Sequence, residues 1–358
     1  MSRSRLLVWD DLDGPAREVD AASFADHLGN APLVWLDLTA PDPATVSQIT
    51  DIVDVDPLVV DDLLDDLELL PKIDDYDDQI FVVLHSLAAT VDRVDTVEID
   101  AIVTDGALVT VAPTEVVSVD WLWRAARRQP GLADAGPAGV LAGLAEVTGR
   151  RFLGILNELE LRIEDLADRA LEGDPDVLLE VRVLRGEEMT LRRILRPQRQ
   201  MLTRMRTGTI PIPDNAKRRF SDAEDVHVQL VESVLASRML MSDVIDTYRG
   251  AMAEDQAEAA KLVAVFAAIL LPMTLVVGYF GMNFEDLPGL RRDLGWLWVT
   301  AGMVVAAVAA WIEFARRGFV RGPRVREAPR TIVRGLASAA KIPAVPLAML
   351  RRPGSRKS

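Results

Sequence analysis

Residues 262–280 have the sequence LVAVFAAILLPMTLVVGYF, nineteen consecutive residues without a charged side chain. A second uncharged run, LGWLWVTAGMVVAAVAAWI, occupies residues 294–312. Each run has the length that a helix needs to cross the hydrocarbon core of a bilayer. Buried core helices of a soluble protein are the alternative, but such helices usually keep a polar face, and these runs have none. The two runs therefore predict a membrane hairpin.

The distribution of charge orients this hairpin. Residues 315–358 contain twelve lysines and arginines against one acid, Glu327, so the formal charge of this tail is +11. Because the whole chain has a formal charge of −15, the residues before the tail carry −26. By the positive-inside rule the basic tail is cytoplasmic, which places the N-terminal part in the cytoplasm and the short loop 281–293 outside. Trp296, Trp298 and Trp311 stand near the ends of the second run, where aromatic belts form.

Composition also narrows the function. An acidic body does not fit a nucleic-acid-binding protein, whereas it fits cations, with the basic tail lying against anionic lipid. The chain has no cysteine, which excludes disulfides and thiolate metal sites. It begins without a secretory signal pattern. The sequence contains no nucleophile–base arrangement, phosphate-binding glycine loop or histidine-rich zinc site, so we expect neither an enzyme nor an organic cofactor.

The rest of the chain predicts an α/β N-terminal cytoplasmic domain (1–137), a long helical stalk (138–261), the hairpin (262–314) and the basic cytoplasmic tail (315–358). Period-two and continuous apolar runs predict the strands, and spacings of three and four predict the helices. The expected strands are Leu33–Leu38, Ile80–Leu84, Val97–Val103 and Ala107–Val111; the expected helices are Pro43–Val53, Pro57–Leu70, Ala138–Leu171, Pro175–Met205 and Ala216–Lys261.

The third stalk helix has no breaker before the membrane, since residues 221–262 contain one glycine, Gly250, and no proline. We expect it to continue into the first span as a helix of more than about 50 residues. So long a helix needs a bundle around it, which favours an oligomer.

A motif follows the first span at once. Residues 279–285 have the sequence YFGMNFE, and Pro288 comes three residues later. This stretch resembles the signature of the CorA family of divalent-cation channels. The resemblance extends to DPLVVDD (56–62), PKIDDY (71–76) with FVVL (81–84), IDTY (245–248) and LPMT (271–274). It implies a homopentameric funnel in the plasma (inner) membrane that transports Mg2+ or Co2+, with both termini cytoplasmic.

The resemblance assigns the ion path. Gly281, Met282 and Asn283 form the selectivity filter, and Val263, Ala267, Leu271, Thr274 and Gly278 line the pore. Mg2+ dehydrates reluctantly, so neutral amide and carbonyl groups hydrogen-bonding its water shell are a fitting filter. Glu285 and Asp286 would concentrate cations in the outer loop. The plainer alternatives are a helix cap for Asn283, helix packing for the stripe and a solvated loop for the two acids.

The resemblance also implies regulation by the transported ion, so Mg2+ is both substrate and regulator. Asp62 and Asp246 match positions where cytoplasmic Mg2+ bridges neighbouring subunits; Asp61 assists, and Asp222 with Asp225 matches a second acidic pair. Facing carboxylates repel unless a divalent ion lies between them, so loss of Mg2+ would let subunits separate and open the pore. Each of these acids is otherwise an ordinary surface charge.

Three departures from the family pattern stand out. Ala257 replaces a frequent asparagine at the cytoplasmic pore mouth, a histidine beside the second acidic pair is displaced to His227, and the tail continues past the usual end. Two other functions stay open: a Zn2+, Co2+ or Ni2+ transporter, proton-coupled as in the related ZntB branch, and a non-conducting membrane-anchored Mg2+ sensor.

Overall fold

A computed structural model describes residues 2–65, 68–76, 78–88, 94–282 and 294–319. The chain divides into two compact units: Met1–Ala170 with Asp174–Thr247, and Leu171–Gly173 with Tyr248–Ser358. The first unit holds the sheet and most of the helical bundle, and the second holds the two apolar helices. Helix α7 contributes residues to both units.

The first unit is built on a seven-stranded sheet in the order β2-β1-β3-β7-β6-β5-β4. Only β3 and β7 pair in parallel among these described strands, and the remaining neighbours are antiparallel. The strands are β1 (Arg3–Trp9), β2 (Arg17–Val19), β3 (Leu33–Thr39), β4 (Lys72–Tyr76), β5 (Gln79–Leu87), β6 (Thr96–Val103) and β7 (Ala107–Ala112).

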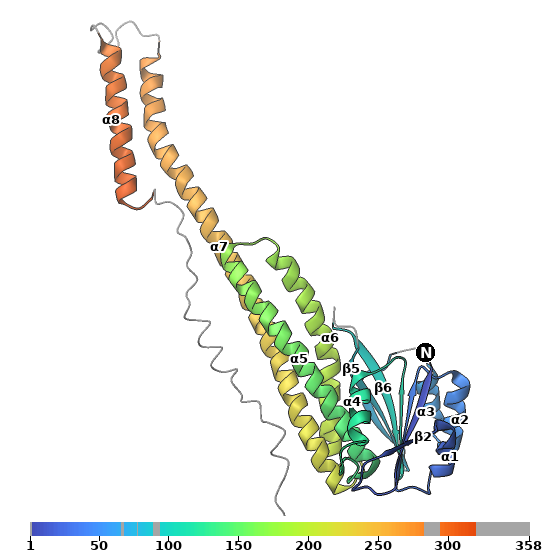
Figure 1. Cartoon of the computed structure of the whole chain (residues 1–358). Helices are drawn as coiled ribbons and strands as arrows, with labels where there is room; N and C mark the ends of the chain where they lie inside the picture. Colours follow the sequence, from blue (N-terminus) through green and yellow to red (C-terminus); the bar gives the residue numbers. More distant parts are fainter. Residues whose placement is uncertain (1, 66–67, 77, 89–93, 283–293, 320–358) are drawn as a thin grey trace, which may run out of the picture. The chain divides into compact units, whose positions relative to one another are not determined.

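Helices cover both faces of this sheet, which explains why its central strands are apolar throughout. On one face, Phe24, Val55 and Val59 pack with alternate strand residues such as Val34 and Val83. The helical elements on this face are η1 (Ala21–Ser23), α1 (Phe24–His27), α2 (Pro43–Val53) and α3 (Pro57–Leu64) (Figure 1).

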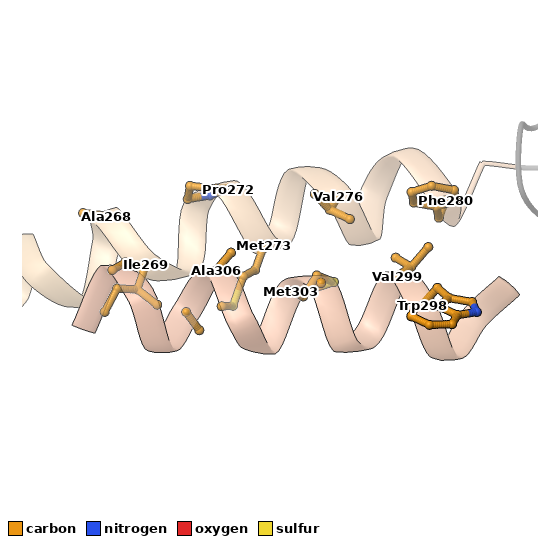
Figure 2. A pocket seen from close by; sticks show the side chains of 13 residues that line it. Ala268, Ile269, Pro272, Met273, Val276, Phe280, Trp298, Val299, Met303 and Ala306 are labelled. Carbon is orange, nitrogen blue, oxygen red and sulfur yellow. The ribbon is translucent and has the colours of Figure 1, made fainter. Parts of the chain in front are cut away.

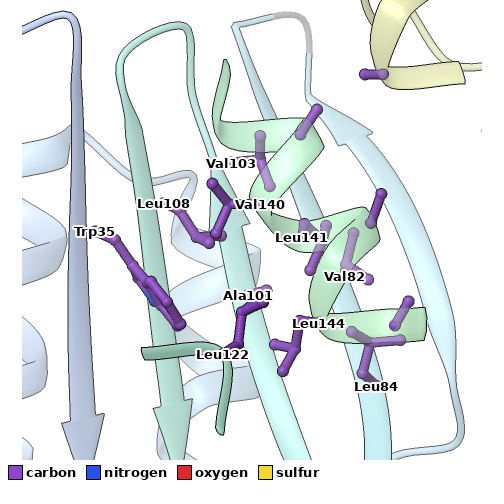
Figure 3. Close-up of a cluster of buried hydrophobic side chains, with 14 of the residues drawn as sticks. Trp35, Val82, Leu84, Ala101, Val103, Leu108, Leu122, Val140, Leu141 and Leu144 are labelled. Carbon is purple, nitrogen blue, oxygen red and sulfur yellow. The ribbon is translucent and has the colours of Figure 1, made fainter. Parts of the chain in front are cut away.

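The opposite face carries the larger core. Figure 3 shows Val140, Leu141 and Leu144 of α5 lying over Val82 and Ala101 of the sheet. The same cluster takes in residues of α4, α6 and α7, so the sheet and the base of the bundle share one core. The helices on this side are α4 (Val117–Ala126), α5 (Gly136–Glu172), α6 (Val177–Arg206) and α7 (Asp214–Phe280).

Local sequence explains where the shorter helices begin and end. Asp42 and Asp56 accept hydrogen bonds from backbone N–H groups at the starts of α2 and α3, and a proline follows each aspartate. The helix predicted over Pro57–Leu70 ends at Leu64, so the prediction was wrong for the residues after Leu64. Asp65 has extended backbone, and the Leu69 N–H donates to the carboxylate of Glu98 on β6 (2.6 Å), which holds this segment against the sheet.

The long helix predicted through the first span is confirmed. Helix α7 has 67 residues and includes the whole run 262–280 despite Pro272, and α8 (Gly295–Arg316) contains most of the second run. Both helices are long and apolar enough to cross a membrane, and their apolar windows are almost entirely exposed. Exposed apolar helices need a lipid or protein environment, in agreement with the predicted hairpin.

A buried polar row joins three strands of the sheet. Asp37 is 2 % exposed, and its carboxylate accepts hydrogen bonds from Arg5 Nε (2.8 Å) and from the Thr110 hydroxyl (2.7 Å). Thr110 also accepts from Trp35 Nε1 (3.0 Å), and the Arg5 guanidinium lies 4.2 Å from the centroid of the Trp123 ring. Burial raises the pKa of Asp37, and the charge of Arg5 opposes that shift. The row fixes β1, β3 and β7 side by side.

We expect Asp37→Ala to lower the free energy of unfolding by about 2–4 kcal/mol, because Arg5 and Thr110 would lose a buried acceptor. Thermal and denaturant unfolding of the full chain in detergent would measure the loss. Asp10→Ala is the matched control, because Asp10 pairs with Arg17 at 3.4 Å on the surface, and its effect should stay within about 0.5 kcal/mol. Equal effects of the two substitutions would contradict the role given to Asp37.

Candidate functional site

The predicted pore stripe lies on the free side of the first span. In Figure 2, side chains from the last turns of α7, including Ile269, Met273 and Phe280, line an apolar groove against α8. The predicted pore residues Ala267, Leu271, Thr274 and Gly278 each stand two positions before a residue that lines this groove. Two positions correspond to a rotation of about 200° around the helix axis. The stripe Val263, Ala267, Leu271, Thr274 and Gly278 therefore faces away from α8, and all five residues are exposed.

The chemistry of this stripe is nearly apolar. Val263 and Leu271 are 68 % and 70 % exposed, and Thr274 is the one hydroxyl among the five residues. In the described conformation Thr274 Oγ1 donates to the backbone oxygen of Leu270 (2.9 Å), which leaves its lone pairs as acceptors. The stripe therefore offers an ion one hydroxyl per chain among apolar side chains.

Helix α7 ends where the signature begins. Gly281 N–H donates to the Val277 carbonyl (2.9 Å), and a Cβ added at Gly281 would lie 2.9 Å from that same oxygen, so glycine allows the helix to finish in this way. Gly281 and Met282 are both exposed. Asn283, Glu285 and Asp286 lie outside the described residues, and the predictions for them stay predictions.

Lys261 joins the start of the first apolar run to the end of α8. Its ammonium donates to the Gly318 carbonyl (3.1 Å) just beyond the end of α8 and lies 4.8 Å from the centroid of the Phe319 ring. A lysine at this boundary donates a hydrogen bond to a carbonyl that has no partner within the helix. Its positive charge also lies beside the negative end of the α8 dipole, which is a favourable interaction. This contact closes the hairpin at the end opposite to the signature.

Of the predicted regulatory acids, Asp62 has the most elaborate surroundings. It lies in the second turn of α3, about one-third exposed, and its carboxylate pairs with the Lys72 ammonium of β4 (2.5 Å). Lys72 also pairs with Asp74 (3.0 Å). Asp61 is exposed on the same helix. A lysine thus occupies the position where a metal ion would compensate Asp62.

Two further acids of this region, Glu98 and Asp100 on β6, were missed by the sequence analysis. They alternate on one face of the strand, with His85 of β5 opposite Glu98. One oxygen of Asp100 is buried without a hydrogen-bond partner. Burial, followed by the charge of Glu98, raises the pKa of Asp100 to about 8, and burial also raises the pKa of Glu98. Asp100 therefore keeps its proton at neutral pH and adds no negative charge beside Asp62.

The second acidic pair has a different character. Asp222 and Asp225 are exposed one turn apart on α7, and burial together with the charges of Glu146 and Asp225 raises the pKa of Asp222. His227 is fully buried: its Nδ1 lies 2.8 Å from the Ala223 carbonyl and its Nε2 lies 2.9 Å from Gln198 Nε2. Burial lowers its pKa to about 4. His227 is therefore a neutral core residue rather than a ligand for this pair.

Asp246 is exposed on α7, on a different element from Asp62. Within the described parts of the chain no three histidine or acidic side chains are grouped so that they could hold a metal ion.

A family comparison decides the class. Residues 30–317 match the model of the family described as "CorA-like Mg2+ transporter protein". The chain belongs to this family. It is accordingly a membrane protein with two C-terminal transmembrane helices that transports divalent metal ions, and it is not an enzyme.

Individual relatives differ in the ion that they carry. The cobalt/magnesium transport protein CorA of Thermotoga maritima is 22 % identical over 84 % of this chain and 87 % of its own length. The zinc transport protein ZntB of Yersinia enterocolitica is 26 % identical over 78 % of this chain and 86 % of its own. The CorA magnesium transporter structure from Methanocaldococcus jannaschii has the same fold, with a TM-score of 0.75 at 19 % identity, over 88 % of this chain and 98 % of that one.

We expect Asp100→Asn to stabilise the protein at alkaline pH. Because the folded pKa of about 8 exceeds the ordinary value of 3.8, ionisation opposes folding increasingly as the pH rises between these values. The amide cannot ionise, so its advantage over the native acid should grow by about 1–3 kcal/mol between pH 5 and pH 9.

Thermal unfolding of the full chain at a series of pH values measures this difference. Asp75→Asn, on the exposed side of β4, is the control and should give parallel curves. A constant offset between Asp100→Asn and the native chain across the pH range would show that Asp100 ionises normally.

Proposed function

We propose that this chain assembles as a homo-oligomer, a pentamer as the resemblance implies, and conducts Mg2+ passively into the cytoplasm through the plasma membrane. The observation that carries the proposal is the exposed stripe from Val263 to Gly278. It occupies the face of α7 opposite α8 and leads to the Gly281-Met282 turn. Copies that place this face around an axis would enclose a narrow apolar path with one ring of hydroxyls.

The proposed filter matches the ion. A hydrated Mg2+ needs donors and acceptors that hold its water shell, and neutral groups hold it weakly enough for release. The Gly281 carbonyl and the Asn283 amide are such groups, and Met282 between them belongs to the same turn. Glu285 and Asp286 supply negative charge in the outer loop. An inside-negative potential drives a divalent ion inward by about 4.6 kcal/mol per 100 mV, so no other energy source is needed.

Gating by cytoplasmic Mg2+ is proposed at Asp62, assisted by Asp61, together with Asp246 of the neighbouring copy. The paired Lys72 is the competitor: at low Mg2+ it neutralises Asp62, and at high Mg2+ the ion replaces it and joins the two subunits. Asp222 and Asp225 form a secondary site, and the negative charge of Glu146 also acts on Asp222. The closed state is then the one with more bound Mg2+.

A transporter for Zn2+ is the second candidate, because ZntB of Yersinia enterocolitica matches this chain at a level similar to that of the CorA relatives. Proton coupling would distinguish it, since a passive Mg2+ channel needs only the membrane potential. Co2+ and Ni2+ remain further substrates to measure. A non-conducting Mg2+ sensor would show no flux of any of these ions.

We expect Asn283→Ala to reduce Mg2+ uptake at least about tenfold, because one lost filter amide per subunit removes several hydrogen bonds to the hydrated ion. Uptake is measured in proteoliposomes with an inside-negative potential and chelated internal Mg2+. Asn157→Ala, on the exposed face of α5, is the control. Unchanged assembly mass with lost flux supports the filter; normal flux in the variant contradicts it. Zn2+ uptake that follows a proton gradient, without Mg2+ uptake, would establish the second candidate.

Lys72→Met should make the channel close at a lower internal Mg2+ concentration, because the ion no longer displaces an ammonium from Asp62. For a partly exposed pair we expect a decrease of about threefold to fivefold in the half-inhibiting concentration. Asp62→Asn should raise that concentration instead. Lys217→Met, which removes an exposed pair with Asp214, serves as the control. A higher half-inhibiting Mg2+ concentration for Lys72→Met would contradict the proposed role of Lys72. The same shift for Lys72→Met and Lys217→Met would contradict it as well.

A further inference from the structure

A stripe of arginines runs along the exposed side of α6. Arg185, Met189, Arg192 and Arg196 follow one another at spacings of four, three and four, so they share one face of the helix. Met189 is 68 % exposed in the middle of this face. Arg185 contacts only the Ser242 hydroxyl of α7 (3.4 Å), and Arg192 and Arg196 form no ion pair within the described parts of the chain.

A complementary stripe lies on α5. Glu158, Leu161, Asp165 and Asp168 follow at spacings of three, four and three and are all exposed. Leu161 is 66 % exposed among the three acids. Asp165 has one distant partner, Arg169 at 3.7 Å, whereas Glu158 and Asp168 have none in the described structure. Each stripe therefore consists of three like charges around one exposed apolar side chain, with opposite signs on the two helices.

The two stripes of one chain do not neutralise each other. Where α5 and α6 meet, Arg162 pairs with Glu187 (3.1 Å). Glu187 stands two residues from both Arg185 and Met189, which is about 200° around the helix. The arginine stripe thus faces away from α5 of its own chain, towards the side of α7, as the contact with Ser242 also indicates. Figure 1 shows the three helices of this bundle together.

We propose that the arginine stripe of α6 binds the acidic stripe of α5 on the next copy of this chain. The two faces are different, so the contact is head-to-tail, and repeating it closes a ring when the rotation allows. Leu161 and Met189 supply an apolar centre, and the surrounding charges set the pairing and disfavour contact between identical faces. This inference rests on the homo-oligomer of the proposed function and names the cytoplasmic surfaces that join it.

Cysteine cross-linking tests the contact directly, because the native chain contains no cysteine. The full-length protein carrying both Leu161→Cys and Met189→Cys, in nanodiscs with a short bis-maleimide, should give a ladder of cross-linked subunits on a denaturing gel. Either substitution alone should give essentially no ladder, since each face then meets a face without a thiol.

Charge reversal in this doubly substituted protein tests the electrostatics. The set Arg185→Glu, Arg192→Glu and Arg196→Glu should lower the ladder yield about tenfold or more, because like charges would then face each other. The set Glu158→Lys, Asp165→Lys and Asp168→Lys should do the same, and the two sets combined should restore most of the yield. Asp105→Lys, exposed in the turn between β6 and β7 and therefore away from α5 and α6, is the control. A milder pair, Arg192→Gln with Arg196→Gln, covers the case in which a triple reversal does not fold.

Native mass spectrometry and Mg2+ uptake separate this inference from the proposed function. Monomers without uptake would overturn both. An oligomer that conducts but gives no ladder, or a ladder that both reversals leave unchanged, would overturn the inference alone. Arginine reversal that spares the ladder but removes co-purified phosphatidylglycerol would assign the stripe to anionic lipid and likewise overturn the subunit contact.

Discussion

The packing of the first turns of α5 on the sheet is the contact on which the rest of the cytoplasmic unit depends. Val140, Leu141 and Leu144 are fully buried there. Truncation of a buried aliphatic side chain such as leucine to alanine typically lowers the free energy of unfolding by about 2–5 kcal/mol. Because the same helix continues into the bundle, this core fixes the direction in which the stalk leaves the sheet. Met201, Met205 and Phe220 of α6 and α7 complete the cluster. The α/β part and the base of the stalk therefore form one cooperative body.

A chain of polar contacts reinforces the same junction. The backbone N–H of His85 on β5 donates to Gln198 of α6 (2.9 Å), and Gln198 in turn contacts His227 of α7. Gly149 of α5 makes this possible, because a Cβ at that position would lie 2.8 Å from the imidazole. Since the Gln198 oxygen already accepts from His85, its amide N–H must donate to His227 Nε2. The neutral imidazole therefore carries its proton on Nδ1, which faces the Ala223 carbonyl. One strand and two helices are joined by a single buried network, and α5 packs closely against it.

Much of this architecture could be predicted from the sequence, and the failures have a common physical cause. The apolar runs of the membrane hairpin, the uninterrupted α7 and the fully buried strands β3 and β7 are local patterns. By contrast, β4 (KIDDY) carries three charges, and it is a strand because β5 pairs with it. Helix α4 (VSVDWLWRAA) is rich in β-branched and aromatic residues, and burial of one side against the core overrides that preference. Strand β1, which was also not predicted, likewise depends on its partner β3. These elements are determined by what they pair with or pack against, and not by a pattern of their own.

The candidate site divides in the same way. The pore stripe could be predicted because a helix fixes which residues share a face, whereas the surroundings of Asp62 could not. Lys72 and Asp100 approach Asp62 only after β4, β5 and β6 have paired. The alternation of Glu98, Ile99 and Asp100 in an otherwise apolar strand was the one available signal. Two acids on one face of a strand indicate either an exposed face or, as here, a partly buried pair whose pKa values are raised.

The two edges of the sheet also limit how copies of this chain can meet. Strand β2 has only three residues, and β4 presents Lys72, Asp74 and Asp75 to its surroundings. Where β5 extends beyond β4, the outward N–H of His85 is already bonded to Gln198. Short, charged or occupied edges resist the addition of a foreign strand. Association by joining sheets is thereby disfavoured during synthesis at the membrane, when many unassembled copies are close together, and helix faces are left as the route to ordered assembly.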